Sequence, residues 1–131
     1  MVQKAFCFGV VPQFEIEAVD WKIFMNRWNI PDWLEKEIYA RDAGCVYCGV
    51  TFGSTPGIGS HRSWEHIVND VRIITRNNIA LCCRACNSSK GARLLAEWLG
   101  SAYCLRRGIG GQSVADVVKL ALENSPRQIS N

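Results

Sequence analysis

Apolar residues along the chain follow two periods, and each period predicts a different kind of element. Spacings of three to four residues, which gather side chains on one helix face, predict four helical segments: 14–28, 31–42, 84–99 and 113–124. Short runs rich in β-forming residues predict three strands: 63–68, 71–75 and 78–82. Because helices and strands mix without the alternation of parallel βαβ units, the sequence predicts a small α+β domain.

Turn-forming residues set the expected ends of these elements. Pro31 suits the first turn of a helix, and Gly44 lies just past its end. Gly91 is expected to kink or split the third helical segment. Ser113 and Asp116 resemble a capping box that opens the last helix. The Gly-rich stretches 51–60 and 108–111 are predicted to be a loop and a linker.

Length and composition indicate one folded domain across residues 1–131. The chain is 48% hydrophobic and 21% charged, which are values typical of globular proteins. No apolar run approaches the roughly 20 residues of a membrane-spanning helix. The apolar start, residues 1–14, is broken by glycine and proline and has no cleavage site of a signal peptide. We therefore expect a cytoplasmic protein without a membrane partner, whose seven cysteines bind metal or are buried.

Charge is distributed unevenly along the chain. Residues 1–42 carry five basic and seven acidic side chains, whereas residues 62–93 carry six basic and two acidic ones. A solvated basic face would explain the second segment, and so would a surface that binds phosphate groups.

The cysteines form the spacing C-x2-C-x34-C-x2-C, from Cys45 and Cys48 to Cys83 and Cys86. Two such knuckles match a closed tetrahedral zinc site, in which four thiolates leave no open position for catalysis. The sequence therefore predicts a structural Zn²⁺ ion. A redox role would need only one CxxC and would leave the other pair unexplained. The remaining cysteines, Cys7, Cys82 and Cys104, are predicted to be buried thiols.

The segment between and through the knuckles, "SWEHIVNDVRIITRNNIALCCRACNSSKG", resembles the HNH endonucleases. That family has a β-hairpin followed by a helix around one divalent metal, often flanked by two CxxC knuckles. Glu65-His66, Asn78 and Asn87 match the three elements of its motif in order, with the spacing H-x11-N-x8-N, and Lys90 matches its trailing lysine. The resemblance covers residues 41–99 and implies a ββα-metal core with flanking helices.

The resemblance also implies a role for each residue in hydrolysis of a DNA phosphodiester bond. His66 would act as general base, and Glu65 and Asn87 would bind Mg²⁺ or Mn²⁺ through oxygen atoms. Asn78 would brace the loop that carries the histidine. The basic residues would contact phosphates of the DNA, expected to be double-stranded: Lys90, Arg62, Arg84, Arg93 and Arg76.

The match departs from the family pattern at two points. It also leaves open which asparagine fills the second position of the motif and what role His61 has. Glu65 stands where the family usually has aspartate, and adjacent strand residues point to opposite faces, so Glu65 and His66 share a site only if the strand bends or ends there. Asn77 could replace Asn78 under a shift of one residue. His61 is either a surface residue or a DNA contact.

Two other functions are consistent with the sequence. A zinc-knuckle module that binds nucleic acid without cleaving it would keep the cysteines and the basic segment, but it would not need a carboxylate beside a phosphate. A zinc-stabilised interaction protein would use the acidic N-terminal portion as its contact surface, and its binding would be insensitive to salt.

Overall fold

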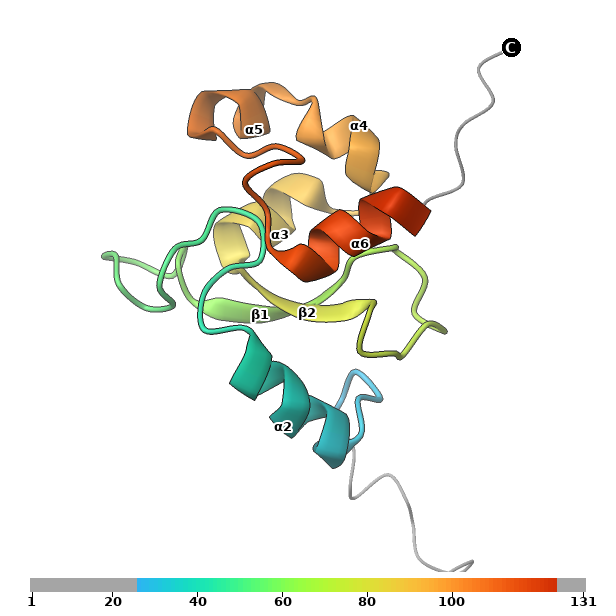
Figure 1. Ribbon diagram of the computed structural model, residues 1–131. Coiled ribbons are helices and arrows are strands. Elements are labelled where there is room, and N and C mark those ends of the chain that lie inside the picture. Colours follow the sequence, from blue (N-terminus) through green and yellow to red (C-terminus); the bar gives the residue numbers. More distant parts are fainter. Residues whose placement is uncertain (1–25, 125–131) are drawn as a thin grey trace, which may run out of the picture. The chain divides into compact units, whose positions relative to one another are not determined.

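The computed structural model describes residues 26–124 (Figure 1). The chain divides into two compact units, Met1–Asp32 and Trp33–Asn131. The predicted motif lies wholly in the second unit, which is the one described below. Of the helix predicted at 14–28, only residues 26–28 fall within the described part, and they do not form a helix.

An antiparallel β-hairpin lies at the centre of this unit. β1 (Arg62–His66) pairs with β2 (Ile79–Cys83) in a register that places Arg62 opposite Cys83 and His66 opposite Ile79. All five residues of β2 are buried, whereas β1 has one fully buried residue, Glu65. Among residues 26–124 the sheet has two strands, so its stability depends on the helices that cover it.

The strand predicted at 71–75 was wrong, because these residues belong to the loop that joins β1 to β2. Asn78 binds the backbone of this loop at three points. Its Oδ1 accepts a hydrogen bond from Val68 N at 2.7 Å, and its Nδ2 donates to Val68 O and Ile73 O at 3.1 Å each. Val71, at 74% exposure, lies mostly in solvent, so burial does not favour a strand here.

Helix α2 (Asp32–Arg41) matches the predicted segment closely and buries Leu34 and Ile38. The two residues at its end complete the free edge of β2. Asp42 accepts a hydrogen bond from Leu81 N at 3.0 Å, and Arg41 donates to Ile79 O at 2.8 Å. Strand edges carry unpaired backbone groups, so this pair of side chains takes the place of a third strand. Figure 1 shows α2 and α3 on opposite sides of the hairpin.

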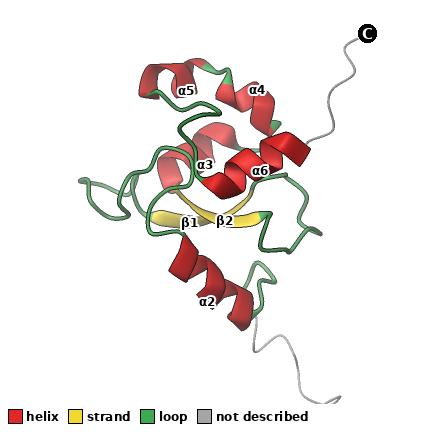
Figure 2. Ribbon diagram, viewed as in Figure 1, coloured by secondary structure: helices red, strands yellow, loops and turns green. Residues whose placement is uncertain are grey.

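The helical segment predicted at 84–99 is split at Gly91, as the sequence indicated. α3 (Arg84–Lys90) ends where Gly91 adopts a φ of 50°, and α4 (Leu95–Leu99) follows after a short turn (Figure 2). Helix α5 (Ala102–Arg107) was not predicted. It is one short amphipathic stretch that begins where the Ser101 side chain accepts a hydrogen bond from Cys104 N.

The last helix, α6 (Asp116–Asn124), begins three residues later than predicted. Ser113 does not cap it, because the Ser113 hydroxyl is used in the preceding turn. It accepts a hydrogen bond from Gly110 N at 3.0 Å and donates to Gly108 O at 3.0 Å. The predicted linker 108–111 is therefore a turn held by this serine.

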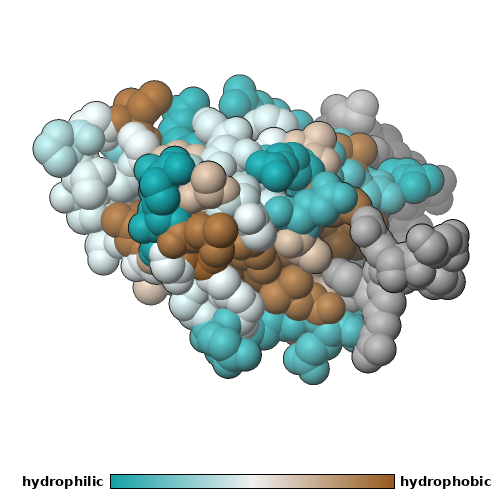
Figure 3. Space-filling view, turned by 90° about the horizontal axis from the view of Figure 1, so that it is seen from above, coloured by the Kyte–Doolittle hydropathy of each residue, from teal (hydrophilic) through white to brown (hydrophobic). Residues whose placement is uncertain are grey.

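The core gathers around Trp98, which is fully buried. The Tyr47 ring meets its indole edge-on at a centroid distance of 4.8 Å, and the indole nitrogen donates to Ser89 Oγ at 2.9 Å. In the view from above, hydrophobic residues gather in a band across the middle of this face, with hydrophilic residues on both sides of it (Figure 3). Within residues 26–124, no helix has both the length and the apolar character needed to cross a bilayer.

Replacing Asn78 by alanine tests whether the loop depends on this side chain. The substitution removes a buried side chain and leaves part-buried backbone groups of Val68 and Ile73 without this partner, so we expect the free energy of unfolding to fall by about 2 kcal/mol or more in urea titrations. Asn77→Ala, at the exposed neighbour, is the control and should change it by less than about 0.5 kcal/mol. If Asn78→Ala and Asn77→Ala lowered the free energy of unfolding by the same amount, the loop would not depend on the Asn78 side chain.

Candidate functional site

The first knuckle is a tight turn that places Cys45 and Cys48 on the same side. Gly49 N donates to Cys45 O at 2.9 Å, and Cys45 N donates to Val50 O at 3.0 Å. Gly49 has a φ of 77°, a conformation that side chains rarely adopt. Val46 N donates to Leu81 O at 3.1 Å, so this turn is attached directly to β2.

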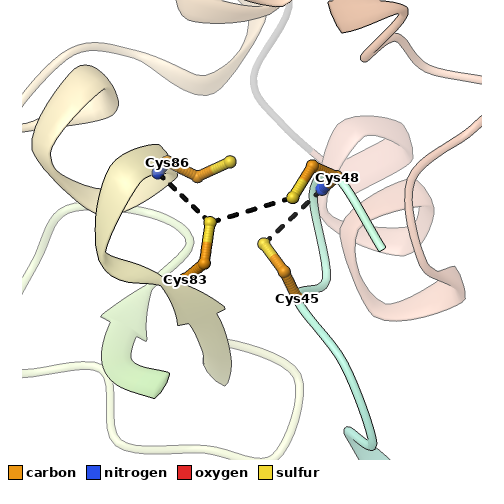
Figure 4. A group of neighbouring side chains, drawn as sticks. All are labelled: Cys45, Cys48, Cys83 and Cys86. Atoms are coloured by element: carbon orange, nitrogen blue, oxygen red, sulfur yellow. Dashed lines mark hydrogen bonds between the residues drawn. The ribbon is translucent and has the colours of Figure 1, made fainter. Parts of the chain in front are cut away.

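The second knuckle spans the junction of β2 and α3. Cys83 is the N-cap of α3, and its sulfur accepts a hydrogen bond from Cys86 N at 3.4 Å. Cys86 therefore lies on the first turn of the helix, beside Cys83 and facing the first knuckle (Figure 4).

The four sulfur atoms meet in one cluster. All lie within 4.8 Å of one another, and Cys48 Sγ is 3.8 Å from Cys83 Sγ. A tetrahedron with Zn–S bonds of ~2.3 Å has sulfur–sulfur edges of ~3.8 Å. All four cysteines are free thiols, and three are buried. The cluster could thus hold a metal ion such as zinc, as the sequence predicted.

The sulfur atoms shift one another's pKa in opposite directions: the pKa of Cys45 and of Cys83 is lowered, whereas hydrogen bonds from neighbouring thiols raise the pKa of Cys48 and of Cys86. Hydrogen bonds from the other three thiols lower the pKa of Cys45 far below its usual range, despite its burial. Cys82 behaves differently: burial raises its pKa, and its side chain points away from the cluster to Ser63 Oγ at 3.7 Å. The prediction of Cys82 and Cys104 as buried thiols is confirmed, whereas Cys7 lies outside the described residues.

Helices α4, α5 and α6 cover the cluster. The Tyr103 hydroxyl donates to Cys86 Sγ at 3.4 Å, and the Tyr103 ring stacks on Trp98 with the centroids 6.0 Å apart. Ala115 N donates to Val46 O at 2.9 Å, which attaches the start of α6 to the first knuckle. Hydrogen bonds to thiolate sulfur of this kind tune and orient metal ligands.

His66 ends β1 and is half-buried. Its Nε2 is buried and has no hydrogen-bond partner among the described residues. Burial lowers the pKa of His66, an effect that the Glu65 and Asp70 carboxylates oppose and the Lys90 ammonium reinforces. The imidazole is therefore favoured in its neutral form, and one of its nitrogen atoms is unused by the fold. His66 and Glu65 are adjacent residues of β1, and each is paired with a residue of β2, so the alternation of strand faces directs the two side chains to opposite sides of the hairpin.

The two asparagines of the predicted motif both touch β1 or the loop after it. Asn78 binds the loop that begins one residue after His66, through the three hydrogen bonds described above. Asn87, on α3, donates from Nδ2 to Ser63 Oγ at 3.0 Å and to Trp64 O at 3.3 Å. These bonds fix the Asn87 amide against the strand, and its Oδ1 accepts no hydrogen bond from the described part of the chain.

Glu65 points into the core and not to the surface. Lys90 Nζ lies 3.1 Å from Glu65 Oε2, and the Tyr47 hydroxyl donates to the same oxygen at 2.5 Å. Burial, followed by the charge of Glu65, raises the pKa of Tyr47 well above its usual range, so Tyr47 remains a donor. Tyr47 is a site residue that the sequence did not indicate, since an aromatic residue inside a CxxC carries no distinct signal.

The predicted phosphate contact of Lys90 requires correction. Its side chain is 1% exposed, and apart from the ion pair with Glu65 its ammonium makes no hydrogen bond within the described region. A phosphate in solution does not reach it in this conformation. The long stem of Lys90 is drawn into the core because Glu65, buried beside it, requires a neutralising charge.

The other predicted phosphate contacts are at the surface, but not all are available. Arg76 binds Glu37 through two hydrogen bonds, of 2.9 and 3.0 Å. Arg62, Arg84 and Arg93 are exposed, and none forms an ion pair within residues 26–124.

The two residues predicted to bind Mg²⁺ or Mn²⁺ lie on β1 and on α3. Glu65 Oε1 and Asn87 Oδ1 accept no hydrogen bond from the described residues, so each leaves one oxygen of the type that hard cations prefer. Both residues adjoin β1, Glu65 within it and Asn87 through Ser63 and Trp64. Lys90 already balances the charge of the Glu65 carboxylate.

Fold and cluster together define a class: a mixed α+β domain with a two-stranded sheet, five described helices and four cysteines that could bind a metal ion. No family model matches the chain, and neither a curated protein nor a solved structure matches it.

We expect the purified protein to contain about one equivalent of zinc, measured by elemental analysis. Cys45→Ala should remove the metal and, with it, cooperative unfolding, because ligand binding is coupled to folding in small metal-stapled domains. Cys104→Ala, at a cysteine that is equally buried but outside the cluster, should retain the metal. Zinc in equal amounts in both variants would exclude the four-cysteine site.

Lys90→Met should lower the free energy of unfolding by about 3 kcal/mol or more, because it leaves the buried Glu65 carboxylate without its counter-charge. The double variant with Glu65→Gln should recover part of the loss, since it removes both charges. Arg76→Met, which breaks an exposed ion pair, serves as the control and should cost less than about 1 kcal/mol. If Lys90→Met lowered the free energy of unfolding as little as Arg76→Met does, the ion pair between Lys90 and Glu65 would not be buried in solution.

Proposed function

We propose that this protein is a zinc-stabilised, metal-dependent endonuclease of the HNH type, which hydrolyses phosphodiester bonds of DNA. The observation that carries the proposal is the state of His66. A histidine that ends a strand, with a lowered pKa and a buried nitrogen that no part of the described fold uses, is suited to accept a proton from water.

The surroundings of His66 support the same assignment. Asn78 holds the loop after it at three points, as the proposed bracing role requires. A general base must be held in place to act, and a buried amide that binds backbone on both sides of a loop achieves this. Asn78 rather than Asn77 makes these contacts, because Asn77 is exposed.

In the proposed reaction, His66 takes the proton of a water molecule that attacks phosphorus. Asn87 and Glu65 would hold a divalent cation, which neutralises the phosphate and stabilises the departing 3′ oxygen. Arg62, Arg84 and Arg93 would bind neighbouring phosphates. The products would carry 5′-phosphate and 3′-hydroxyl ends, as the resemblance to the HNH endonucleases implies.

A second function is a zinc-stabilised module that binds nucleic acid without cleaving it. One specific contact favours it: the Glu65 carboxylate is already paired with Lys90, so it has a role in stability that requires no catalytic metal. Both functions use the exposed arginines, so binding alone does not separate them.

Cleavage of a supercoiled plasmid in Mg²⁺ or Mn²⁺ separates the two functions. We expect the wild-type protein to nick the plasmid and His66→Ala to be slower by a factor of about 100 or more, because it lacks the general base. His61→Ala replaces the other histidine, which is exposed, and should cleave at the wild-type rate. Both variants should retain zinc and bind DNA with wild-type affinity.

Equal rates for His66→Ala and the wild type would exclude His66 as the base and point to a contaminating nuclease. Binding without cleavage by the wild-type protein, in either metal, would favour the non-catalytic module.

A further inference from the structure

One surface beside β1 combines aromatic rings with an exposed cation. The Tyr39 ring of α2 meets the Trp64 ring of β1 edge-on, with the centroids 5.3 Å apart. The Arg62 guanidinium lies over the Tyr39 ring, 4.7 Å from its centroid. We call Tyr39, Trp64 and Arg62 the aromatic platform. Arg62 and Trp64 are two residues apart on one strand, so they share a face of the hairpin.

The platform is a surface feature and not part of the core. Tyr39 is 40% exposed, Arg62 is exposed and Trp64 is half-buried. Neither Tyr39 nor Trp64 is among the residues that pack around Trp98. A ring pair that contributes little to the core but is held rigidly between a helix and a strand is the kind of surface on which a planar ligand stacks.

The charge around the platform indicates which planar ligand fits. Arg62 pairs with Cys83 across the hairpin, and Arg84 follows Cys83 directly, so the backbones of the two exposed arginines are neighbours at this end of the hairpin. Neither forms an ion pair within the described part of the chain. Two unpaired cations beside an aromatic surface are complementary to a nucleobase with its flanking phosphates.

We propose that the aromatic platform binds an unpaired base of single-stranded DNA. The base takes the place of the Arg62 guanidinium over the Tyr39 ring, and the released guanidinium binds a flanking phosphate together with Arg84. The exchange is favourable because an exposed cation–π contact is weaker than a base–aromatic stack. A base in a duplex does not reach Tyr39 in this way, since its faces are already stacked on its neighbours.

Binding of a base at the platform does not require nuclease activity. Its consequence for the choice of substrate does rest on the proposed nuclease function. His66 follows Trp64 by two residues, a distance of roughly 7 Å along an extended strand. A phosphate next to the stacked base would therefore lie near the proposed general base. The preferred substrate would be DNA with an unpaired segment, in place of the uninterrupted duplex expected from the sequence.

Fluorescence anisotropy with labelled oligonucleotides tests the platform in the absence of a catalytic metal. Three probes are compared at one fixed, low salt concentration: a thymidine 12-mer, a 12-mer with the same phosphates but abasic sites at its central positions, and a hairpin duplex. We expect the full-length protein to bind the thymidine probe at least about fivefold more tightly than the abasic one.

Tyr39→Ala should weaken binding of the thymidine probe by a factor of about five or more and change binding of the abasic probe and the duplex by less than about twofold. Tyr39→Phe should retain wild-type affinity. Trp33→Ala removes another exposed aromatic residue of α2, at 60% exposure, and should have no effect. The zinc content of each variant reports whether it is folded.

Equal binding of the thymidine and abasic probes, or equal effects of Tyr39→Ala and Trp33→Ala, would overturn the platform. The outcome is independent of the nuclease proposal. A protein that never cleaves but loses single-strand affinity in Tyr39→Ala has the platform without the activity. A protein that cleaves DNA while Tyr39→Ala binds like the wild type has the activity without the platform.

Discussion

The structure depends on the meeting of four cysteine sulfur atoms from two segments that are 34 residues apart. Helix α3 has seven residues, no acidic residue in its first turn and a glycine at its end, so it would not be stable alone. Its start is fixed because Cys83 and Cys86 belong to the cluster. The same fixation positions Asn87, the next residue, whose amide reaches β1. A cluster that could bind a metal ion in this way sets the position of a residue that lies outside it.

In the described part of the chain, two buried side-chain nitrogen atoms make no hydrogen bond: Lys90 Nζ, which forms an ion pair with Glu65, and His66 Nε2. Asp42 satisfies the backbone of β2, Asn78 satisfies the loop between the strands, and Glu65 is balanced by Lys90 and Tyr47. Each of these contacts offsets a desolvation cost that would otherwise fall on a small core. A buried nitrogen without a partner in such surroundings is unusual, and this contrast gives the His66 assignment its weight.

The spacing of residues along the sequence predicted those parts of the structure that depend on a single kind of residue. The C-x2-C pairs indicated the cluster, and the apolar run after Asn78 indicated β2, because thiolate geometry and strand burial act locally. The sequence did not indicate that Lys90 is buried, since that depends on Glu65 and Tyr47, which are distant in the chain. Residues 71–75 have strand-forming side chains, but the Asn78 amide binds the loop backbone in place of a partner strand.

The pairing of Glu65 with Lys90 has a consequence for the proposed nuclease. The two side chains form an ion pair, so in the proposed nuclease the site without DNA would attract a divalent cation only through neutral oxygen donors and a carboxylate that is already balanced. A bound phosphodiester brings the missing negative charge and further oxygen ligands. Metal binding would then be coupled to substrate binding, and each would strengthen the other by the same factor. Lys90 would in this way stabilise the empty site and restrict the metal to the complex with DNA.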